Sequence, residues 1–423
     1  MHYVIIGAGP AGVTAAENLR KFDRDAKISI IGDEKEPPYS RMALPYLLMN
    51  KIGESGSHLR KSPDHFTKLA INVMQQRVIA LKADDKQLLL GGGDTLQYDK
   101  LLIATGSHPV KLAMPGIDLP GVLNCWTLAD ARQISQRVRK GARVVLLGAG
   151  FIGCIILEAL VKSGAQLTVV EIGDRMVPRM MNEKAGALIK AWCVAKGVIV
   201  YTQTRITSVQ RNACGTALLV KLDTGVYLAA DVLVSAAGVK ANIEFLQSSG
   251  IQTDDGILVD RHLQTNIADI YAAGDVAQGL DFSTDDYSVQ AIQPTAVDHG
   301  LLAAKNMVGF REVINHGNIN MNVLDTLGLI ACSFGLWRGV DGGESVERCH
   351  PEGFQYINLQ FADDVLVGAT AIGLTQHVGV LRGLIQSKIR LGVWKQRLLQ
   401  DPTRIMEAYI GSTQALGFNA PVL

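Results

Sequence analysis

Three closely spaced glycines near the N-terminus are the first residues of this sequence that suggest chemistry. Gly7, Gly9 and Gly12 follow a short apolar stretch, His2–Ile6, and the segment from Val13 to Phe22 then carries apolar side chains with helical spacing. In such a turn the first glycine permits the sharp bend, the second lets the backbone approach a pyrophosphate, and the third lets the helix pack closely on the strand. The segment therefore predicts a dinucleotide site, with the phosphates at the start of the helix.

An acidic pair lies at the distance from these glycines that ribose binding requires. The next apolar stretch, Lys27–Ile31, is followed by Asp33 and Glu34, about 20 residues beyond the turn, as the dinucleotide fingerprint demands. A carboxylate at this position accepts hydrogen bonds from the ribose hydroxyls of a bound dinucleotide. Strand, turn, helix, second strand and acid thus occur in the expected order.

The whole unit then occurs a second time. The apolar stretch Arg143–Leu147 leads into Gly148, Gly150 and Gly153, and a further strand pattern ends at Glu171. Two complete units in one chain predict two dinucleotide sites, because the coincidence is more specific than either match alone. The alternative is a pair of such units that bind nothing, and the double match argues against it.

The composition fits a globular protein of roughly two or three domains. The chain has 423 residues, of which 48% are hydrophobic and 19% charged. With 41 basic and 40 acidic residues, bulk charge gives no sign of binding to nucleic acid or to an anionic membrane. The most apolar stretch, from Val144 to Val161, is broken by three glycines and Glu158, so no membrane span is expected. The scattered cysteines have no metal-ligand spacing and there is no secretory signal, so we expect a cytoplasmic protein without a bound metal.

Two further segments point to a family. One apolar strand ends in Ala104, Thr105 and Gly106, and another ends in Gly274 and Asp275. Together with the N-terminal fingerprint, and in this order, they resemble the FAD-dependent pyridine-nucleotide oxidoreductases of the glutathione-reductase structural superfamily. The resemblance implies that the first fingerprint binds FAD, that Asp275 hydrogen-bonds the ribityl chain, and that the second fingerprint binds the nicotinamide cofactor. The structural alternative for Asp275 is a turn-forming aspartate after glycine.

The predicted fold class is α/β, with two Rossmann-like FAD- and NAD(P)-binding domains of the three-layer ββα type and a small C-terminal α+β domain. We expect a discontinuous FAD-binding domain at residues 1–112 and 239–312, with the NAD-binding domain, residues 113–238, inserted between its parts. Residues 313–423 would form a C-terminal α+β interface domain. That domain is expected to close over the flavin or to form a homodimer.

A proline-initiated helix supplies the last part of the predicted flavin site. Pro294, Thr295 and Ala296 resemble the family segment whose helix N-terminus faces the flavin pyrimidine, where a positive helix end would stabilise an anionic reduced flavin. The alternative is that Pro294 is simply a favoured first-turn proline. No side chain is predicted to act as a catalytic acid, base or nucleophile. The predicted cofactor-binding residues are Gly7, Gly9, Pro10, Ala11, Gly12, Asp33, Glu34, Arg41, Val78, Ala104, Thr105, Gly106, Gly274, Asp275, Pro294, Thr295, Ala296, Gly148, Gly150, Phe151, Ile152, Gly153, Glu171 and Gly238.

Glu171 bears on which nicotinamide cofactor the second site takes. A carboxylate at this position accepts hydrogen bonds from both adenosine ribose hydroxyls and repels a 2′-phosphate. Arg175, four residues further on, would weaken that preference if it faced the same ribose. We expect NADH to be preferred over NADPH.

Thiol chemistry beside the flavin is not expected. Disulfide reductases of this superfamily carry a CxxxxC pair, and none occurs in this sequence. The segment Leu44-Pro45-Tyr46 resembles the coenzyme A disulfide reductases, but Met42 holds the position of their cysteine. A thioether forms neither a thiolate nor a mixed disulfide, so the electrons must leave by another route.

The segment from Pro38 to Arg41 also resembles the rubredoxin reductases and the flavin region of NADH-dependent nitrite reductase. The C-terminal part supports this branch, with two strands at 354–361 and 365–372 and a helix at 378–388. The resemblance implies that NADH gives hydride to the flavin and that single electrons then pass to a separate carrier, a rubredoxin or a ferredoxin. An acidic carrier could use a group of basic side chains for steering, although a solvated helix face is the interpretation that we favour. These side chains are Arg382, Lys388, Arg390, Lys395, Arg397 and Arg404.

Ile155 is a departure from the family, whose members usually carry a glutamate there that contacts the nicotinamide. Glu158 lies nearly one helical turn away and need not replace it. Two alternatives stay open: an NADH oxidase or quinone reductase that works from flavin alone, and a slow flavoprotein that senses NADH, which Ile155 favours. His299, His350 and His377 are isolated in the sequence, and we interpret them as surface or core residues rather than proton donors.

Overall fold

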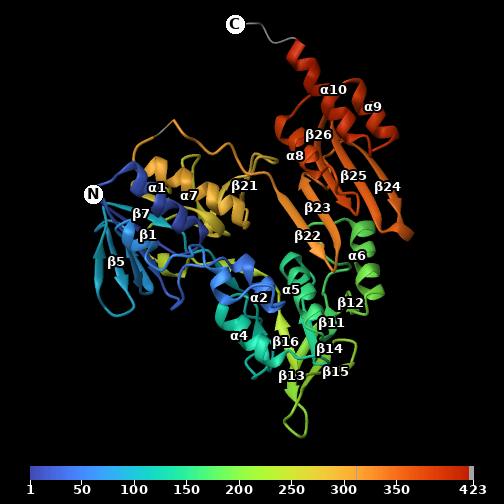
Figure 1. Cartoon of the computed structure of the whole chain (residues 1–423), viewed down its shortest axis with the longest axis horizontal. Helices are drawn as coiled ribbons and strands as arrows, with labels where there is room; N and C mark the ends of the chain where they lie inside the picture. The colour runs from blue at the N-terminus through green and yellow to red at the C-terminus, as the bar shows by residue number, and fades with distance from the viewer. Residues whose placement is uncertain (311, 419–423) are drawn as a thin grey trace. The chain divides into compact units, whose positions relative to one another are not determined.

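The computed structural model describes residues 1–310 and 312–418 (Figure 1). The chain divides into two compact units. Unit 1 comprises Met1–Val110, Trp126–Leu128 and Val239–Asn318. Unit 2 comprises Lys111–Cys125, Ala129–Gly238 and the chain from Ile319 onward.

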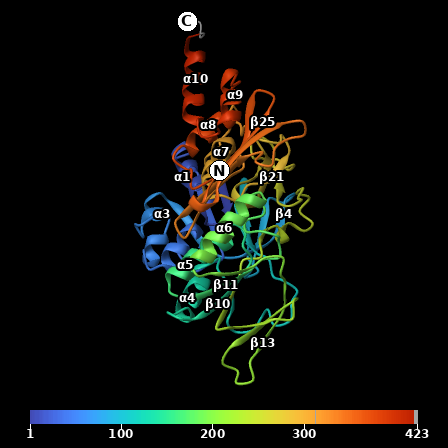
Figure 2. The same cartoon turned by 90° about the vertical axis from the view of Figure 1, so that its right-hand side faces the viewer.

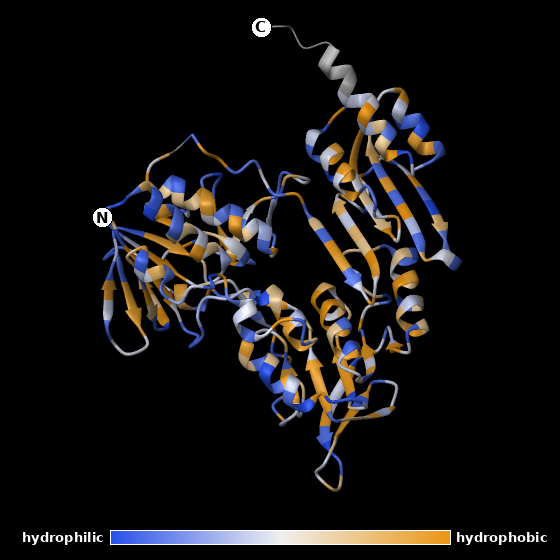
Figure 3. Cartoon of the chain, in the orientation of Figure 1, coloured by the Kyte–Doolittle hydropathy of each residue, from blue (hydrophilic) through white to orange (hydrophobic). Residues whose placement is uncertain are grey.

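A five-stranded parallel sheet forms the centre of unit 1, with the strand order β19-β7-β1-β2-β3. Its inner strands are runs of Val, Ile and Leu buried on both faces; Val4, Ile5 and Leu102, for example, have no exposed surface. Such uninterrupted apolar runs are what a parallel sheet covered on both faces requires. Figure 3 shows the same strands as hydrophobic. The strands are β1 (His2–Ile6), β2 (Lys27–Gly32), β3 (Ile71–Gln75), β7 (Lys100–Ile103) and β19 (Ile270–Ala272).

Helices α1 (Pro10–Phe22) and α7 (Gln293–Met307) pack against each other in unit 1. The approach is close because Gly300 of α7 has no side chain: a Cβ built there would lie 2.4 Å from the carbonyl oxygen of Ala11. The helices α2 (Leu44–Leu48) and α3 (His65–Lys68) are short. The remaining strands are β4 (Val78–Lys82), β5 (Gln87–Leu90) and β6 (Thr95–Gln97) in one antiparallel sheet, β8 (Ser107–Pro109) paired with β17 (Val239–Ala241), and β18 (Ile257–Leu258), β20 (Ala277–Leu280) and β21 (Tyr287–Val289) in a third small sheet.

Unit 2 repeats this plan. A parallel sheet of order β12-β11-β10-β16-β9 is accompanied by an antiparallel sheet of order β13-β14-β15. The parallel strands are β9 (Val122–Asn124), β10 (Arg143–Leu147), β11 (Gln166–Val170), β12 (Ile199–Tyr201) and β16 (Val232–Ser235). The antiparallel strands are β13 (Ile206–Arg211), β14 (Leu218–Leu222) and β15 (Tyr227–Ala230). The helices are α4 (Leu128–Arg137), α5 (Phe151–Lys162) and α6 (Glu183–Ala195).

The C-terminal part of unit 2 is an antiparallel sheet of order β22-β23-β26-β25-β24 with three helices beside it (Figures 1 and 2). The two predicted strands are present as β25 (Gln355–Ala362) and β26 (Val365–Ile372), which pair as an antiparallel hairpin. The predicted helix is α8 (Val378–Ser387), which Lys388 ends in a left-handed conformation. The other elements are β22 (Met321–Thr326), β23 (Leu329–Gly335), β24 (Glu344–His350), α9 (Val393–Gln400) and α10 (Ile405–Phe418).

The predicted class, α/β with two Rossmann-like sheets and a small C-terminal α+β part, is confirmed. The compact units describe packing, and the functional boundaries given above remain a prediction. In the part of the chain that the structure describes, no helix is both long and apolar enough to cross a membrane.

Candidate functional site

The first glycine turn follows β1 and has the geometry that its spacing predicts. Gly7 has a φ of +113°, and a Cβ there would lie 2.1 Å from the carbonyl oxygen of Ala104. A Cβ on Gly12 would lie 2.0 Å from the carbonyl oxygen of Gly7. Around Gly9, in contrast, a Cβ would meet nothing within 4 Å. The first and third glycines are thus required by contacts inside the protein, whereas the second borders open space that a pyrophosphate could occupy.

In unit 1 the N-terminal ends of α1 and α7 both lie beside the turn that contains Gly274. Gly9 is the N-cap of α1 and makes no side-chain capping bond, and Ile292 caps α7 in the same way. Gly274 lies between the two helices, because a Cβ there would be 3.2 Å from the Cβ of Ala11 and 3.5 Å from that of Ala296. Backbone N–H groups at such helix starts, with no side chain to accept from them, are suited to anions. Pro10, Pro294 and Thr295 belong to the same two first turns.

The segment of Ala104, Thr105 and Gly106 borders the glycine turn from the next strand, β7. The Ala104 N–H donates to the Ile6 carbonyl at 2.7 Å. Asn242 holds the rest of the segment: its side-chain amide donates to the Thr105 carbonyl at 2.7 Å, and its backbone N–H donates to the Gly106 carbonyl at 2.9 Å. Asn242 belongs to no predicted motif and lies 137 residues from Thr105.

The two acids predicted to follow β2 differ in their surroundings, because Glu34 is hydrogen-bonded within unit 1 and Asp33 is not seen to be. One Glu34 oxygen accepts from Arg41 Nη2 at 2.8 Å, and the other accepts from the Tyr39 hydroxyl at 2.6 Å. Asp33 is exposed. Burial raises the pKa of Tyr39, so its hydroxyl stays protonated as a donor. Val78, at the start of β4, contributes its side chain to the hydrophobic core of the unit.

Asp275 follows β19 and lies among polar groups of the same unit. The Ser107 hydroxyl donates to Asp275 Oδ2 at 3.4 Å. Burial raises the pKa of Asp275, although Ser107 and the more distant Arg41 act in the opposite direction. A carboxylate with this little solvation and one long hydrogen bond retains acceptor capacity for a ligand hydroxyl. Of the predicted flavin residues, Gly274 packs against Ala11 of α1 and Ala296 of α7, and Asp275 follows it directly.

We call the residues around the Gly7–Gly12 turn, together with Gly274 and Asp275, the cradle of unit 1, and those around the Gly148–Gly153 turn, together with Glu171, the cradle of unit 2. Two residues outside the predicted motifs support the cradle of unit 1. Trp126 accepts from Arg41 Nη1 through its carbonyl at 2.7 Å and donates its indole N–H to the Ser107 carbonyl at 2.9 Å. His299 is 4% exposed and accepts from the Gly274 N–H at 3.4 Å through Nδ1. Burial lowers the pKa of His299 to about 4. His299 is thus a neutral core residue, as interpreted, and His350 and His377 are exposed.

The second glycine turn repeats the geometry of the first in unit 2. Gly148 has a φ of +99°, and a Cβ there would lie 2.6 Å from the carbonyl oxygen of Ala236. A Cβ on Gly153 would lie 2.3 Å from the carbonyl oxygen of Gly148, and one on Gly150 would meet nothing within 4 Å. Gly238, two residues after Ala236, has a φ of +115° and is exposed. Gly150 is the N-cap residue of α5 and makes no side-chain capping bond, and Phe151 and Ile152 follow it in the first turn of the helix.

Glu171 is held against this turn by the backbone. Its Oε2 accepts from the Ala149 N–H at 2.6 Å and its Oε1 accepts from the Gly173 N–H at 2.7 Å. The side chain of Arg175 is bound to other groups than Glu171. Its Nε donates to the Met181 carbonyl at 3.0 Å, and its Nη1 pairs with Asp174 at 2.7 Å. The arginine that could have favoured a 2′-phosphate is therefore occupied by other partners.

No carboxylate takes the place of the missing family glutamate on α5. Ile155 is partly buried, and Glu158 forms an i,i+4 ion pair with Lys162. Cys154 has no exposed surface, and burial raises the pKa of its thiol well above the usual value. Cys154 is therefore a residue of the hydrophobic core. Met42 is 49% exposed at its position in unit 1, and all six cysteines of the chain are free.

The C-terminal basic side chains are largely engaged within unit 2. Lys395 pairs with Glu344 and Arg404 pairs with Glu407. Arg397 and Arg404 also stack on the ring of Trp394. These contacts agree with a solvated, internally paired helix face rather than with an excess of positive charge.

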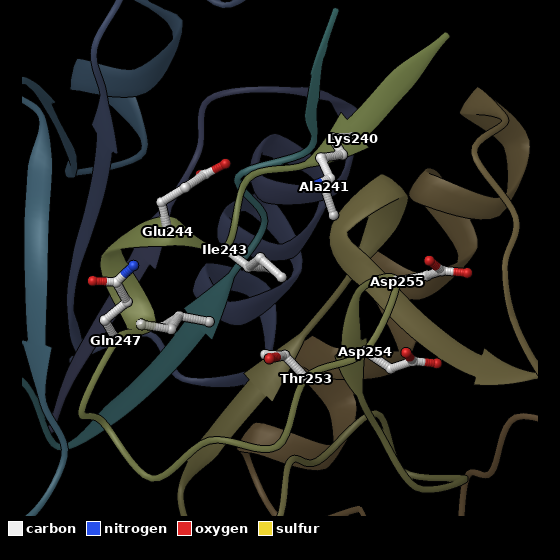
Figure 4. Close-up of a pocket in the computed structure, with 9 residues that line it drawn as sticks. Lys240, Ala241, Ile243, Glu244, Gln247, Thr253, Asp254 and Asp255 are labelled. Carbon is white, nitrogen blue, oxygen red and sulfur yellow. The ribbon is translucent and has the colours of Figure 1, made fainter. Parts of the chain in front are cut away.

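A separate depression of about 320 Å³ lies in unit 1, apart from the predicted residues (Figure 4). Its walls come from two segments, 240–247 and 253–255, and none of the predicted cofactor-binding residues lines it. Three of its lining residues, Glu244, Asp254 and Asp255, are acidic, which does not suit an anionic dinucleotide.

Comparison with known proteins agrees with this geometry. Residues 1–300 match the family model described as pyridine nucleotide-disulphide oxidoreductase. The ferredoxin–NAD(+) reductase component of the anthranilate 1,2-dioxygenase system of Burkholderia cepacia is 32% identical over 419 residues, which cover 97% of this chain and 98% of that protein. Subunit epsilon of the NADH-dependent phenylglyoxylate dehydrogenase of Aromatoleum evansii is 30% identical over 414 residues, 97% of each chain.

Solved structures show the same architecture. An NAD-dependent persulfide reductase from A. fulgidus superposes with a TM-score of 0.86 at 26% identity, covering 93% of this chain and 78% of that one. The putidaredoxin reductase–putidaredoxin complex gives a TM-score of 0.89 at 23% identity, with 97% and 99% covered, a likeness of fold. The resemblance inferred from the motifs is thereby confirmed. The chain belongs to the pyridine nucleotide-disulphide oxidoreductase family, without the redox cysteine pair that gives the family its name.

Proposed function

We propose that this chain is an FAD-dependent NADH oxidoreductase that delivers electrons to a separate small carrier protein of the rubredoxin or ferredoxin type. The observation that carries the proposal is the pair of dinucleotide cradles in one chain that has Met42 where thiol-using relatives have cysteine. The ferredoxin–NAD(+) reductase component that resembles the chain over nearly its full length supports the same activity. Rubredoxin-NAD(+) reductase of Pseudomonas putida, 30% identical over 289 residues, supports it as well.

The residues of unit 1 fit FAD. Gly9 and the uncapped start of α1 would receive the pyrophosphate, with the Arg41 guanidinium as a further positive group. Glu34 would accept from the adenosine ribose hydroxyls and Asp275 from the ribityl chain. The start of α7, at Pro294, would place its positive end toward the flavin pyrimidine.

The residues of unit 2 fit NADH. Gly150 borders the open space for the pyrophosphate, and Glu171 holds its carboxylate against the turn with lone pairs left for the ribose hydroxyls. We propose that NADH is preferred over NADPH, because the Glu171 carboxylate repels a 2′-phosphate and Arg175 is paired with Asp174.

When bound at these residues, FAD would supply the redox chemistry, namely hydride acceptance from NADH and single-electron release to the carrier. The side chains supply position and electrostatics. Met42 cannot form a thiolate, so it forms no mixed disulfide with a substrate. Ile155 presents an apolar surface where relatives carry a carboxylate, so the nicotinamide end depends on backbone groups and packing for its orientation.

The proposed functional division follows the motifs. Residues 1–112 with 239–312 would bind FAD, 113–238 would bind NADH, and 313–423 would form an interface domain that closes over the flavin or forms a homodimer. Static light scattering of the purified protein would show whether a homodimer forms.

A second candidate is a reductase subunit within a larger enzyme. The observation that favours it is the similarity to subunit epsilon of a phenylglyoxylate dehydrogenase over 97% of both chains. In that case the electron partner would be another subunit and not a diffusing carrier.

The decisive experiment measures NADH oxidation by the FAD-loaded chain with a panel of rubredoxins and ferredoxins, and with oxygen or a quinone alone. Reduction of a carrier protein at rates well above the oxygen background supports the proposal. Equal rates with oxygen or a quinone alone would instead indicate an oxidase or quinone reductase. Very slow turnover with every acceptor would indicate an NADH sensor.

A further inference from the structure

We propose that Trp126 is a positioning residue of the flavin cradle, which orients Arg41 through its ring and carbonyl and anchors Ser107 through its indole N–H. The inference rests on the proposed function, since it assigns unit 1 to FAD. Trp126 lies in none of the glycine-rich or strand-end motifs of the chain.

Trp126 contacts Arg41 through both its ring and its backbone carbonyl. The guanidinium carbon lies 5.4 Å from the centroid of the Trp126 ring and 5.7 Å from that of Tyr39. Arg41 Nη1 donates to the Trp126 carbonyl at 2.7 Å, while Nη2 donates to Glu34. A guanidinium has five N–H donors in a fixed plane, so these contacts set the direction in which its remaining donors point. A phosphate contact from Arg41 would depend on that direction.

The indole N–H of Trp126 reaches a second part of the site. The indole N–H donates to the Ser107 carbonyl at 2.9 Å, and the Ser107 hydroxyl donates to Asp275 Oδ2 at 3.4 Å. Ser107 is 6% exposed, so its position is well constrained. One side chain therefore connects the arginine beside Glu34, the adenosine-ribose acid, with the serine beside Asp275, the ribityl acid.

The chain also makes a short excursion into unit 1 at Trp126. Trp126–Leu128 belong to unit 1, although the residues on both sides of them belong to unit 2. The three residues are pinned there: the Leu128 N–H donates to the Tyr39 hydroxyl at 3.3 Å, and the Leu128 side chain has no exposed surface. Ordering such a short excursion costs conformational entropy, which these specific contacts must offset.

The test measures the FAD dissociation constant of the full-length apoprotein by flavin fluorescence titration. Trp126→Phe keeps an aromatic ring and removes only the N–H, so we expect binding about fivefold weaker, the effect of one hydrogen bond. Trp126→Leu also removes the ring beside Arg41 and should weaken binding about threefold further. In an Arg41→Gln background the step from the Phe variant to the Leu variant should have no effect, because the cation that the ring orients is absent.

Trp192 provides a matched control in unit 2. Its indole N–H also donates to a backbone carbonyl, that of Thr326 at 3.0 Å, and its ring also carries a cation, Lys196 at 4.3 Å. Trp192→Phe and Trp192→Leu should leave the FAD dissociation constant unchanged. Circular dichroism of each variant checks folding, and Trp126→Phe is the conservative change that keeps the test available if the leucine variant does not fold.

The outcomes separate the inference from the proposed function. If the wild-type apoprotein does not bind FAD, both are wrong. If the wild type binds FAD and both Trp126 variants bind it equally tightly, the inference alone is wrong. It is also overturned if the Trp192 variants lose as much affinity, or if the Phe-to-Leu step is the same with and without Arg41.

Discussion

Replacing His299 by glutamine should flatten the dependence of stability on pH. His299 is 4% exposed, and burial lowers its pKa from 6.5 to about 4. Because the pKa is depressed in the folded state, the unfolded chain binds a proton between these values that the folded chain does not. Stability therefore falls as pH drops through the window from 6.5 to about 4. At about 1.4 kcal/mol per unit the whole window corresponds to about 3 kcal/mol, of which about 2.5 kcal/mol appears between pH 7.5 and 4.5.

The assay is urea unfolding of the FAD-loaded protein at a series of pH values, for the wild type and His299→Gln. The variant loses the contact to Gly274 and should be less stable at pH 7.5, but the wild type should lose more stability on acidification, so that the two curves converge. Carboxyl groups, including Asp275 with its raised pKa, titrate in both proteins and cancel in the difference. His350→Gln, at an exposed histidine, serves as the control and should parallel the wild type. Curves for wild type and His299→Gln that stay parallel within about 0.5 kcal/mol would refute the reasoning.

Three further predictions concern the two cradles. Gly12→Ala places a Cβ 2.0 Å from the Gly7 carbonyl oxygen, so the purified variant should lack the bound flavin; normal flavin content would contradict the account. Glu171→Ala removes the carboxylate that opposes a 2′-phosphate, and the ratio of kcat/KM for NADH to that for NADPH should fall about tenfold or more, equivalent to about 1.4 kcal/mol; an unchanged ratio would be evidence against its role. Ile155→Glu restores the family glutamate and should speed flavin reduction by NADH in stopped-flow measurements, whereas a slower reduction would show that Ile155 is already suited to the nicotinamide.

Most of the two cradles could be predicted because their chemistry is local. Gly7 and Gly12 contact each other across one turn, and Gly148 and Gly153 do the same, so spacing alone reports the geometry. The acids that follow β2 and β11 could be predicted in the same way, because each lies about 20 residues beyond its glycine turn. The hydrogen bonds of Glu34 did not follow, because its partners Arg41 and Tyr39 lie outside the turn.

The supporting residues could not be predicted because their partners are far away in the sequence. Trp126 meets Arg41 across 85 residues, and Asn242 meets Thr105 across 137. His299 has its ring nitrogens beside Gly274 and Asn318, contacts that only the packing of α7 produces. No periodicity or spacing rule encodes such pairs in a single sequence.

The central claim is that one chain holds both FAD and the NADH that reduces it. Its most direct test is an anaerobic titration of the FAD-loaded protein with NADH, followed by the visible absorbance of the flavin. We predict that NADH bleaches this absorbance in proportion to the flavin present, and that addition of an oxidised carrier protein restores it. A flavin band that persists at millimolar NADH, in a protein that retains its FAD, would contradict the account.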